Sequence, residues 1–196
     1  MKSFENTLNK KYFFSSCEIC DAMCCDGKSG TLFSQLVLEE FETVFKNFPI
    51  AFLIGNLGYL KPVVLLTNGK NSCRYLENNK CSIYDKRPVV CSLYPLSAHL
   101  TNTVFIDLTC PAVGENGSLI ANNGKASKEF EHPILEEYQE KYLKMHFHFE
   151  KFNKKENLEV LGKINGNTFY RFKEDFDDKY IKMHLESLVN FDKYFI

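Results

Sequence analysis

The chain has 196 residues, of which 44% are hydrophobic and 14% aromatic, which is enough for one substantial core and hardly enough for two full domains. Its 24 Lys and Arg residues nearly balance its 25 Asp and Glu residues, and the formal net charge of -1 gives no overall field that would attract nucleic acid or an acidic membrane. The composition therefore indicates no nucleic-acid or membrane partner, and it leaves the partner unknown.

The amino-terminal residues and the most apolar stretch both argue against export and membrane insertion. Glu5, Asn6 and Asn9 fall where a secretory signal peptide would need an apolar run. Residues 48–67 are interrupted by two prolines, two glycines and Lys61, whereas a membrane span needs about 20 nearly continuous apolar residues. We expect a cytoplasmic protein in which residues 48–67 are buried core.

Short strands are expected over the first 120 residues. Residues 31–48 predict a short strand that leads into an amphipathic helix, and residues 62–67 predict a strand ahead of a turn at Asn68-Gly69. Two short extended pieces, 74–76 and 81–84, flank a tight connection. A further strand at 103–108 leads to the last cysteine.

The remainder of the chain carries no cysteine. A long helix is predicted from Ser127 to Asn153 with Pro133 in its first turns, followed by a hairpin around residues 165–167 and a final helix from Phe176 to Tyr194. The predicted fold class is α+β. A small cysteine-rich metal-binding domain with short strands would occupy residues 1–120, and a helical and hairpin extension packed on it would occupy residues 121–196.

Eight cysteines are the main chemical signal of the sequence. Four disulfides are disfavoured because the chain shows no export signal, is too large to need cross-links and has two adjacent cysteines. In a reducing cytosol, many thiols are usually kept for metal ligation or redox chemistry. We therefore predict that all eight are metal ligands: Cys17, Cys20, Cys24, Cys25, Cys73, Cys81, Cys91 and Cys110.

The spacing of the cysteines limits the kinds of site. If residues 17–25 are helical, Cys17, Cys20 and Cys24 lie within about 60° of one another and Cys25 lies about 100° off that stripe. Eight thiolates suffice for two four-cysteine sites, for one four-iron cluster with four spare thiols, or for a single multinuclear site. The spacing fits neither the bacterial nor the plant-type ferredoxin pattern, and no second C-x2-C completes a zinc ribbon.

Two blocks, residues 17–25 and residues 73–95, resemble the YkgJ-type cysteine-cluster family, also called CxxCxxCC, which is described as a zinc- or iron-chelating domain. The second block resembles that family's C…CxIYxxRPxxCRxYP pattern, and the resemblance covers about residues 17–117. Ser92 stands where the family often has a basic residue. A similar cysteine domain occurs in flagellin lysine methylases, where an iron–sulfur cluster is implicated in methyl transfer. The residues that carry the second block are Cys73, Cys81, Ile83, Tyr84, Arg87, Pro88, Cys91, Tyr94 and Pro95.

Other polar residues have both a structural and a functional interpretation. Arg87 could be a solvated or capping residue of a turn, or it could donate to a cluster sulfur or a bound anion. Tyr84 and Tyr94, each three residues after a cysteine, could be core residues or neighbours of the metal. His146 and His148 face different directions on a helix, so they are expected at the surface or in the core.

The sequence therefore predicts a metal-binding protein of unknown physiological reaction. It would hold an iron–sulfur cluster, with 4Fe–4S as the preferred form, or zinc. One alternative is a cluster-dependent transferase resembling flagellin lysine methylases, and another is a thiol redox switch or structural zinc module. The sequence contains none of the common nucleotide-binding, hydrolase or metalloprotease motifs, so catalytic residues are unknown and the question of enzymatic activity is left open.

Overall fold

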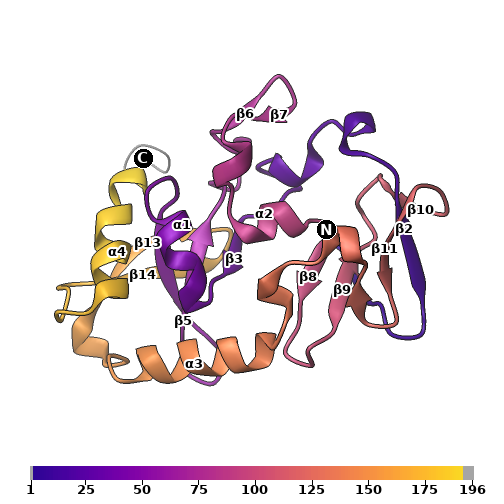
Figure 1. Ribbon diagram of the computed structural model, residues 1–196. Helices are drawn as coiled ribbons and strands as arrows, with labels where there is room; N and C mark the ends of the chain where they lie inside the picture. The colour runs from indigo at the N-terminus through magenta and orange to yellow at the C-terminus, as the bar shows by residue number, and fades with distance from the viewer. Residues whose placement is uncertain (1, 192–196) are drawn as a thin grey trace.

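The computed structural model of the protein describes residues 2–191 (Figure 1). The largest sheet among these residues is antiparallel and has five strands. Its strand order is β13-β14-β4-β5-β3. Figure 1 shows α1 and α4 beside this sheet and α3 running along its lower end. These elements are β3 (Phe33–Gln35), α1 (Phe41–Val44), β4 (Ile50–Ile54), β5 (Leu60–Leu65), α3 (Tyr138–Glu150), β13 (Leu158–Ile164), β14 (Asn167–Phe172) and α4 (Lys179–Ser187).

The helices cover the sheet through fully buried side chains. Phe41 of α1 and Phe149 of α3 stack with ring centroids 5.8 Å apart, and Phe149 meets Phe52 of β4 edge to face at 5.0 Å. Ile181 of α4 packs in the same cluster. The prediction that residues 48–67 are buried core is confirmed for most of β4 and β5, although Ile54 at the end of β4, Lys61 and the turn between these strands reach solvent.

Two smaller sheets lie at the other end of the molecule, opposite α4 (Figure 1). One has the order β1-β9-β8 and the other β10-β2-β11-β12, and they share an apolar cluster that includes Ile106 and Ile120. The helix α2 and the two-stranded β6–β7 hairpin lie between the two ends. These elements are β1 (Phe4–Asn6), β2 (Lys11–Phe14), β6 (Leu76–Glu77), β7 (Lys80–Cys81), α2 (Val89–Leu93), β8 (Leu96–Ala98), β9 (Val104–Asp107), β10 (Val113–Gly114), β11 (Ser118–Asn122) and β12 (Lys125–Ala126).

The predicted tight connections form because asparagine and glycine tolerate the left-handed backbone that a two-residue turn requires. Asn78 and Asn79 join β6 to β7 with φ angles of 50° and 59°, and Asn165 and Gly166 join β13 to β14 with 48° and 81°. The turn at Asn68 also forms, because its side chain accepts two backbone N–H groups, but no paired strand follows it directly.

The first predicted C-terminal helix is shorter than expected, and the second begins three residues later than expected. Over residues 127–153 the structure contains two 3-10 turns, Lys128–Phe130 and Pro133–Leu135, and α3 begins only at Tyr138. The reason is local, since Pro133 has no N–H to donate and Glu137 has a φ of 50°. The last helix begins at Lys179, where Asp178 caps it by accepting the N–H groups of Tyr180 and Ile181. The end of the predicted range, residues 192–194, lies outside the described residues.

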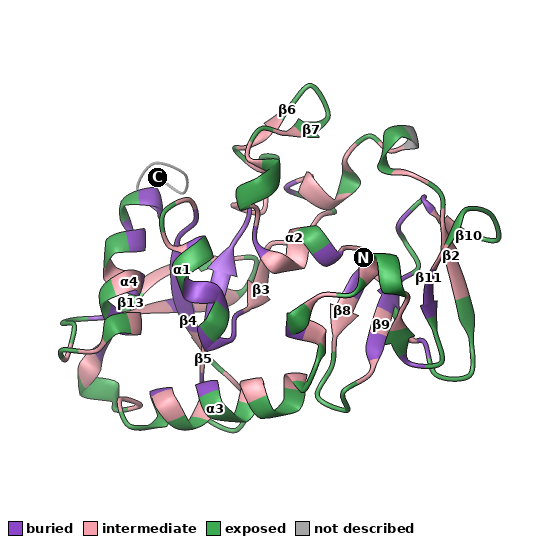
Figure 2. Cartoon of the chain, in the orientation of Figure 1, coloured by how far each residue is buried: buried purple, intermediate pink, exposed green. Residues whose placement is uncertain are grey.

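The α+β class is confirmed, because helices and several small antiparallel sheets share the chain. Figure 2 shows the buried positions gathered along β4, β5, β9 and β11. The C-terminal hairpin β13–β14 completes the sheet that holds β3, β4 and β5, and β11, which runs through residue 120, pairs with β2 near the amino terminus. The division of the chain at residue 120 stays a prediction. Among residues 2–191, no helix is both long and apolar enough to span a membrane.

Candidate metal centre

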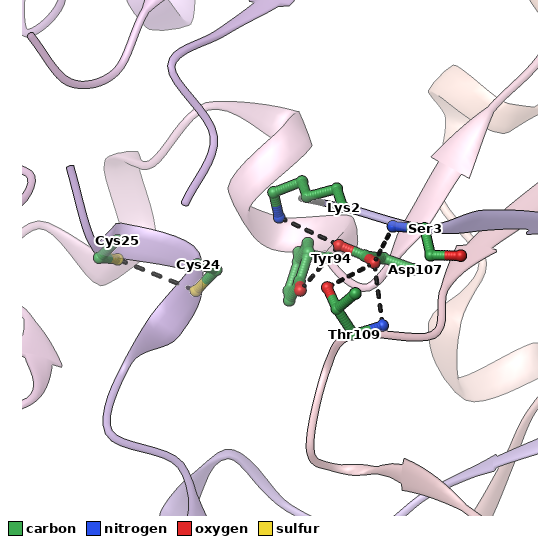
Figure 3. A network of polar contacts seen from close by, with 7 residues as sticks. All are labelled: Lys2, Ser3, Cys24, Cys25, Tyr94, Asp107 and Thr109. Atoms are coloured by element: carbon green, nitrogen blue, oxygen red, sulfur yellow. Dashed lines mark hydrogen bonds and ion pairs between the residues drawn. The ribbon is translucent and has the colours of Figure 1, made fainter. Parts of the chain in front are cut away.

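The first four cysteines lie in two short 3-10 helices, not in the continuous helix that was predicted. These helices are Cys17–Ile19 and Met23–Cys25, and Ala22 between them has a left-handed φ of 54°. The predicted stripe of three cysteines on one helix face is therefore wrong. The second helix places the Sγ atoms of Cys24 and Cys25 3.9 Å apart (Figure 3).

The loop after Cys25 is fixed to the segment that carries Cys73. The Cys73 N–H donates to the Cys25 carbonyl oxygen at 2.8 Å. Gly27 is buried against the same segment, and a Cβ atom added at Gly27 would lie 2.0 Å from the Asn71 carbonyl oxygen. The close approach therefore requires glycine at position 27. It holds the segment that carries Cys25 beside the segment that carries Cys73.

A second connection brings the amino-terminal cysteines to the last one. The Ser15 N–H donates to the Ala112 carbonyl oxygen at 2.9 Å, and Phe14 of β2 pairs with Val113 of β10. Cys110 lies just before this pairing in a turn that its own N–H closes on the Asp107 carbonyl at 3.2 Å. The segment that leads to Cys17 is therefore held beside the segment that contains Cys110.

The β6–β7 hairpin and α2 supply the remaining two cysteines. Cys81 pairs with Leu76 in the hairpin, and the adjacent Tyr75 anchors it by donating its hydroxyl to the Asn47 carbonyl at 2.9 Å. Cys91 lies in α2 and packs against the edge of the main apolar cluster, as does Cys73. This apolar contact positions α2 relative to the segment from residue 73 to residue 83.

The thiols affect one another's pKa values, and these effects identify neighbours. Contact with the Cys25 thiol lowers the pKa of Cys24 to about 6 against the opposing effect of burial, with smaller effects of Lys2 and Arg87. The same contact, burial and the thiolate charges of Cys24, Cys73 and Cys91 raise the pKa of Cys25.

The more buried cysteines show the same repulsion between thiolates. Burial and then the charges of Cys73, Cys24 and Cys81 raise the pKa of Cys91. Burial raises the pKa of Cys110, the Ala112 N–H opposes this rise, and the charges of Cys20 and Cys17 add to it. Because all eight cysteines are free thiols, a bound cation would relieve the repulsion that opposes their ionisation.

The donor chemistry of this region suits a thiophilic metal. Cysteine thiolates favour zinc and iron–sulfur clusters over magnesium or calcium, which prefer oxygen ligands. In the described part of the chain, no three Cys, His, Asp or Glu side chains are arranged to hold a single metal ion. The assignment of the eight cysteines as ligands therefore stays a prediction.

The two candidate histidines of α3 make separate contacts. His146 lies against the ring of Tyr59 with centroids 4.4 Å apart, whereas the His148 Nε2 atom is 2.9 Å from a carboxylate oxygen of Asp178. Their divergence agrees with the prediction that they face different directions. His184 is fully buried and contacts the Ile50 carbonyl through Nδ1 at 2.7 Å.

Two cations close to the cysteines each lie over a tyrosine ring. The Arg87 Cζ atom is 3.6 Å from the centroid of the Tyr84 ring, and the Arg87 Nε atom donates to the Ser92 hydroxyl at 3.1 Å. The Lys2 Nζ atom is 4.1 Å from the centroid of the Tyr94 ring (Figure 3). The structure thus gives Tyr84 and Tyr94 a role that the sequence left open.

A carboxylate network next to Cys24 was not predicted from the sequence. Asp107 is fully buried and accepts hydrogen bonds from the Tyr94 hydroxyl at 3.0 Å, the Thr109 hydroxyl at 2.7 Å and the Ser3 N–H at 3.1 Å, and it forms an ion pair with Lys2 at 3.2 Å (Figure 3). Its only sequence signal was an acidic residue inside the apolar strand predicted at 103–108. Lys2 gave no signal, because 105 positions separate it from Asp107 in the sequence.

Comparison with known proteins identifies the cysteine-rich part of the chain. Residues 16–111 match the model of the CxxCxxCC family, described as a putative zinc- or iron-chelating domain. This range contains all eight cysteines. No solved structure matches the chain.

Proposed function

Because residues 16–111 belong to the CxxCxxCC family, we propose that the chain is a metal-binding protein whose eight cysteines act as two sets of four ligands. The proximal set, defined by its link to the β2–β10 pair, contains Cys17, Cys20, Cys24 and Cys110. The distal set, defined by its link to the five-stranded sheet, contains Cys25, Cys73, Cys81 and Cys91.

The observation that carries this proposal is the agreement between backbone contacts and thiol electrostatics. The hydrogen bond from the Cys73 N–H to the Cys25 carbonyl joins the distal set, and the charge of Cys73 raises the pKa of both Cys25 and Cys91. The charges of Cys20 and Cys17, after burial, raise the pKa of Cys110, in keeping with the link between residues 15 and 112.

Cys24 lies between the two sets. Its charge raises the pKa of Cys17 after burial, and it also acts on Cys91. We assign it to the proximal set because Cys25 completes the distal one. Adjacent residues then serve different sites, which explains why a chain would place two cysteines side by side.

We further propose that the metal is an iron–sulfur cluster of the 4Fe–4S type, with zinc as the alternative. Four thiolates satisfy either group. The family description names both zinc and iron. The resemblance to the cysteine domains of flagellin lysine methylases, in which an iron–sulfur cluster is implicated, supports iron. Metal binding at both sites would contribute folding free energy because the unfolded chain does not bring the four ligands of a site together.

Metal analysis of anaerobically purified protein tests this function. We expect iron and sulfide together with a broad absorption band near about 400 nm on general iron–sulfur grounds, or zinc without colour. The variants Cys81→Ser and Cys110→Ser should each lose about half of the metal, because each would remove one of two equal sites. Met23→Leu, at an exposed position beside Cys24, is the control that should keep all of it.

The outcomes separate the two parts of the proposal. Wild-type protein without iron or zinc would contradict metal binding itself. Loss of all metal from either single variant would instead show one shared site, and it would overturn the division into two sets while leaving metal binding intact.

A thiol redox switch is a second candidate function, favoured by the 3.9 Å contact between the Cys24 and Cys25 thiols. Thiol titration in air and under reductant should then change without loss of metal. The cluster-dependent transferase receives no support from the cavity of about 320 Å³ beside β9 and β12, because none of the eight cysteines lines it. That alternative remains a prediction.

A further inference from the structure

We infer that Arg87 and Lys2 are fixed counter-cations of the metal–thiolate centre and that they determine how tightly it retains its metal. This inference rests on the proposed function. It assigns a role to two side chains that are not metal ligands and that lie far apart in sequence. Each is fixed by a tyrosine ring and by a polar side chain, and the tyrosine is in each case three residues after a cysteine.

Arg87 is oriented from two directions. The ring of Tyr84 lies 3.6 Å from its Cζ atom, and its Nε atom donates to the Ser92 hydroxyl at 3.1 Å. Ser92 in turn donates to the Pro88 carbonyl at 3.4 Å, which ties the arrangement to the first turn of α2. A guanidinium group held in this way loses less conformational freedom when it interacts with an anionic centre.

The position of Arg87 follows from the residues that hold it. Ser92 directly follows Cys91 in α2, and Tyr84 lies three residues after Cys81. Arg87 is therefore anchored between the segments that carry Cys81 and Cys91, two members of the proposed distal set.

Lys2 approaches the same place from the amino terminus. Its Nζ atom lies 4.1 Å from the Tyr94 ring centroid and 3.2 Å from an Asp107 oxygen, and only 18% of its side chain is exposed. Tyr94 donates to the same Asp107 oxygen at 3.0 Å, so the lysine, the ring and the carboxylate fix one another. Figure 3 shows this network facing Cys24.

The need for cations follows from the charge of the ligands. Four thiolates around one zinc ion carry a net charge of about -2, since each thiolate contributes -1 and zinc contributes +2. A partly buried anionic centre is unfavourable unless positive groups lie beside it. Asp107 offsets part of the Lys2 charge, whereas Arg87 is anchored by the neutral Ser92. Arg87 should therefore have the larger effect.

Loss of metal to a chelator tests the role of these charges. Purified metal-loaded protein is mixed with excess EDTA, and the rate of metal release is followed by absorbance or by a metal indicator. Arg87→Gln should release metal about tenfold faster than wild type, in line with the usual effect of losing a group beside a metal ligand, and Lys2→Gln should show a smaller acceleration. Arg87→Lys, which keeps the charge, should recover most of the retention.

Lys179→Gln is the matched control, because Lys179 also lies over a tyrosine ring, with its Nζ atom 4.6 Å from the Tyr180 centroid, but on α4. It removes the same charge from the whole molecule and should leave release unchanged. Tyr84→Leu keeps the Arg87 charge but removes its ring, and it should accelerate release less than Arg87→Gln.

Two results would overturn the inference. Equal release rates for Arg87→Gln and Lys179→Gln would show that the charge at position 87 has no effect on the centre. Equal acceleration in Arg87→Gln and Arg87→Lys would show that only the shape of the arginine matters. Wild-type protein that carries no metal would contradict the proposed function itself, so the two failures are distinguishable.

Discussion

Substitution of Gly27 tests whether the loop contact next to Cys25 builds the distal set. Gly27 is buried, and a Cβ atom at this position would lie 2.0 Å from the oxygen, 2.4 Å from the carbon and 2.6 Å from the nitrogen of Asn71. All three are backbone atoms, so no flexible side chain can turn away. Gly27→Ala must therefore separate the loop at residues 25–27 from the segment at residues 71–73.

The size of the effect follows from these distances. An ordinary contact between a carbon and an oxygen atom is about 3.4 Å, so the two segments must move apart by about 1.4 Å. A shift of that size would break the 2.8 Å hydrogen bond from the Cys73 N–H to the Cys25 carbonyl and cost about 1 kcal/mol. Misplacement of two ligands should weaken metal retention about 10- to 100-fold, comparable with the loss of a supporting group at a metal site.

Chelator competition on metal-loaded protein measures this loss, and total metal content measures whether only the distal set is affected. We expect Gly27→Ala to lose up to half of its metal readily while the proximal set retains its share. Gly114→Ala is the control, since a Cβ atom there meets nothing within 4 Å. If both alanine variants retained metal as wild type does, the loop contact would have no role in forming the centre, and the reasoning would be wrong.

Three further predictions concern buried groups outside the centre. Burial raises the pKa of Glu40 to about 7. The protonated carboxyl therefore stabilises the folded state below about pH 4.5, and this stabilisation is lost as the pH rises to 7. The free energies of unfolding of wild type and Glu40→Gln, measured in urea, should diverge by about 3 kcal/mol over that range. Burial lowers the pKa of His184 to about 4, so wild type should lose about 3 kcal/mol relative to His184→Gln as the pH falls from about 6.5 to 4, and identical profiles would refute this. Phe149→Ala should reduce the free energy of unfolding by about 3–5 kcal/mol, whereas Leu143→Ala at an exposed position of the same helix should change it by less than 1 kcal/mol.

The parts of the fold that could be predicted from the sequence depend on neighbouring residues. The β13–β14 hairpin was predictable because Asn165 and Gly166 favour the left-handed backbone of its turn. The start of α3 was predictable only in part, because Pro133 marks an interruption but no residue type at position 137 indicates the left-handed backbone after which the helix begins. The pairing of β14 with β4 joins Tyr170 to Phe52, and no local pattern indicates a contact between residues so far apart.

The candidate centre shows the same limit. The eight cysteines and their resemblance to the CxxCxxCC pattern could be recognised from spacing. The proposed grouping could not, because it is argued from the contact between Gly27 and Asn71 and from the pairing of Phe14 with Val113. The helical stripe failed because Ala22 adopts a left-handed backbone that a sequence without glycine at this position does not reveal. Lys2 and its carboxylate partner are separated by more than 100 residues, so only the folded chain brings them together.

The adjacent thiols of Cys24 and Cys25 have a mechanical consequence if they serve different sets. The proximal set is attached to the β2–β10 pair, and the distal set is attached through Cys73 and Cys91 to the core of the five-stranded sheet. A single peptide bond would then link the two metal-bound loops. The bound metals would therefore hold the two ends of the molecule together. Removal of the metals would release this connection between the two ends, while each sheet would keep its own apolar cluster. The relative position of the two ends would then depend on whether metal is bound.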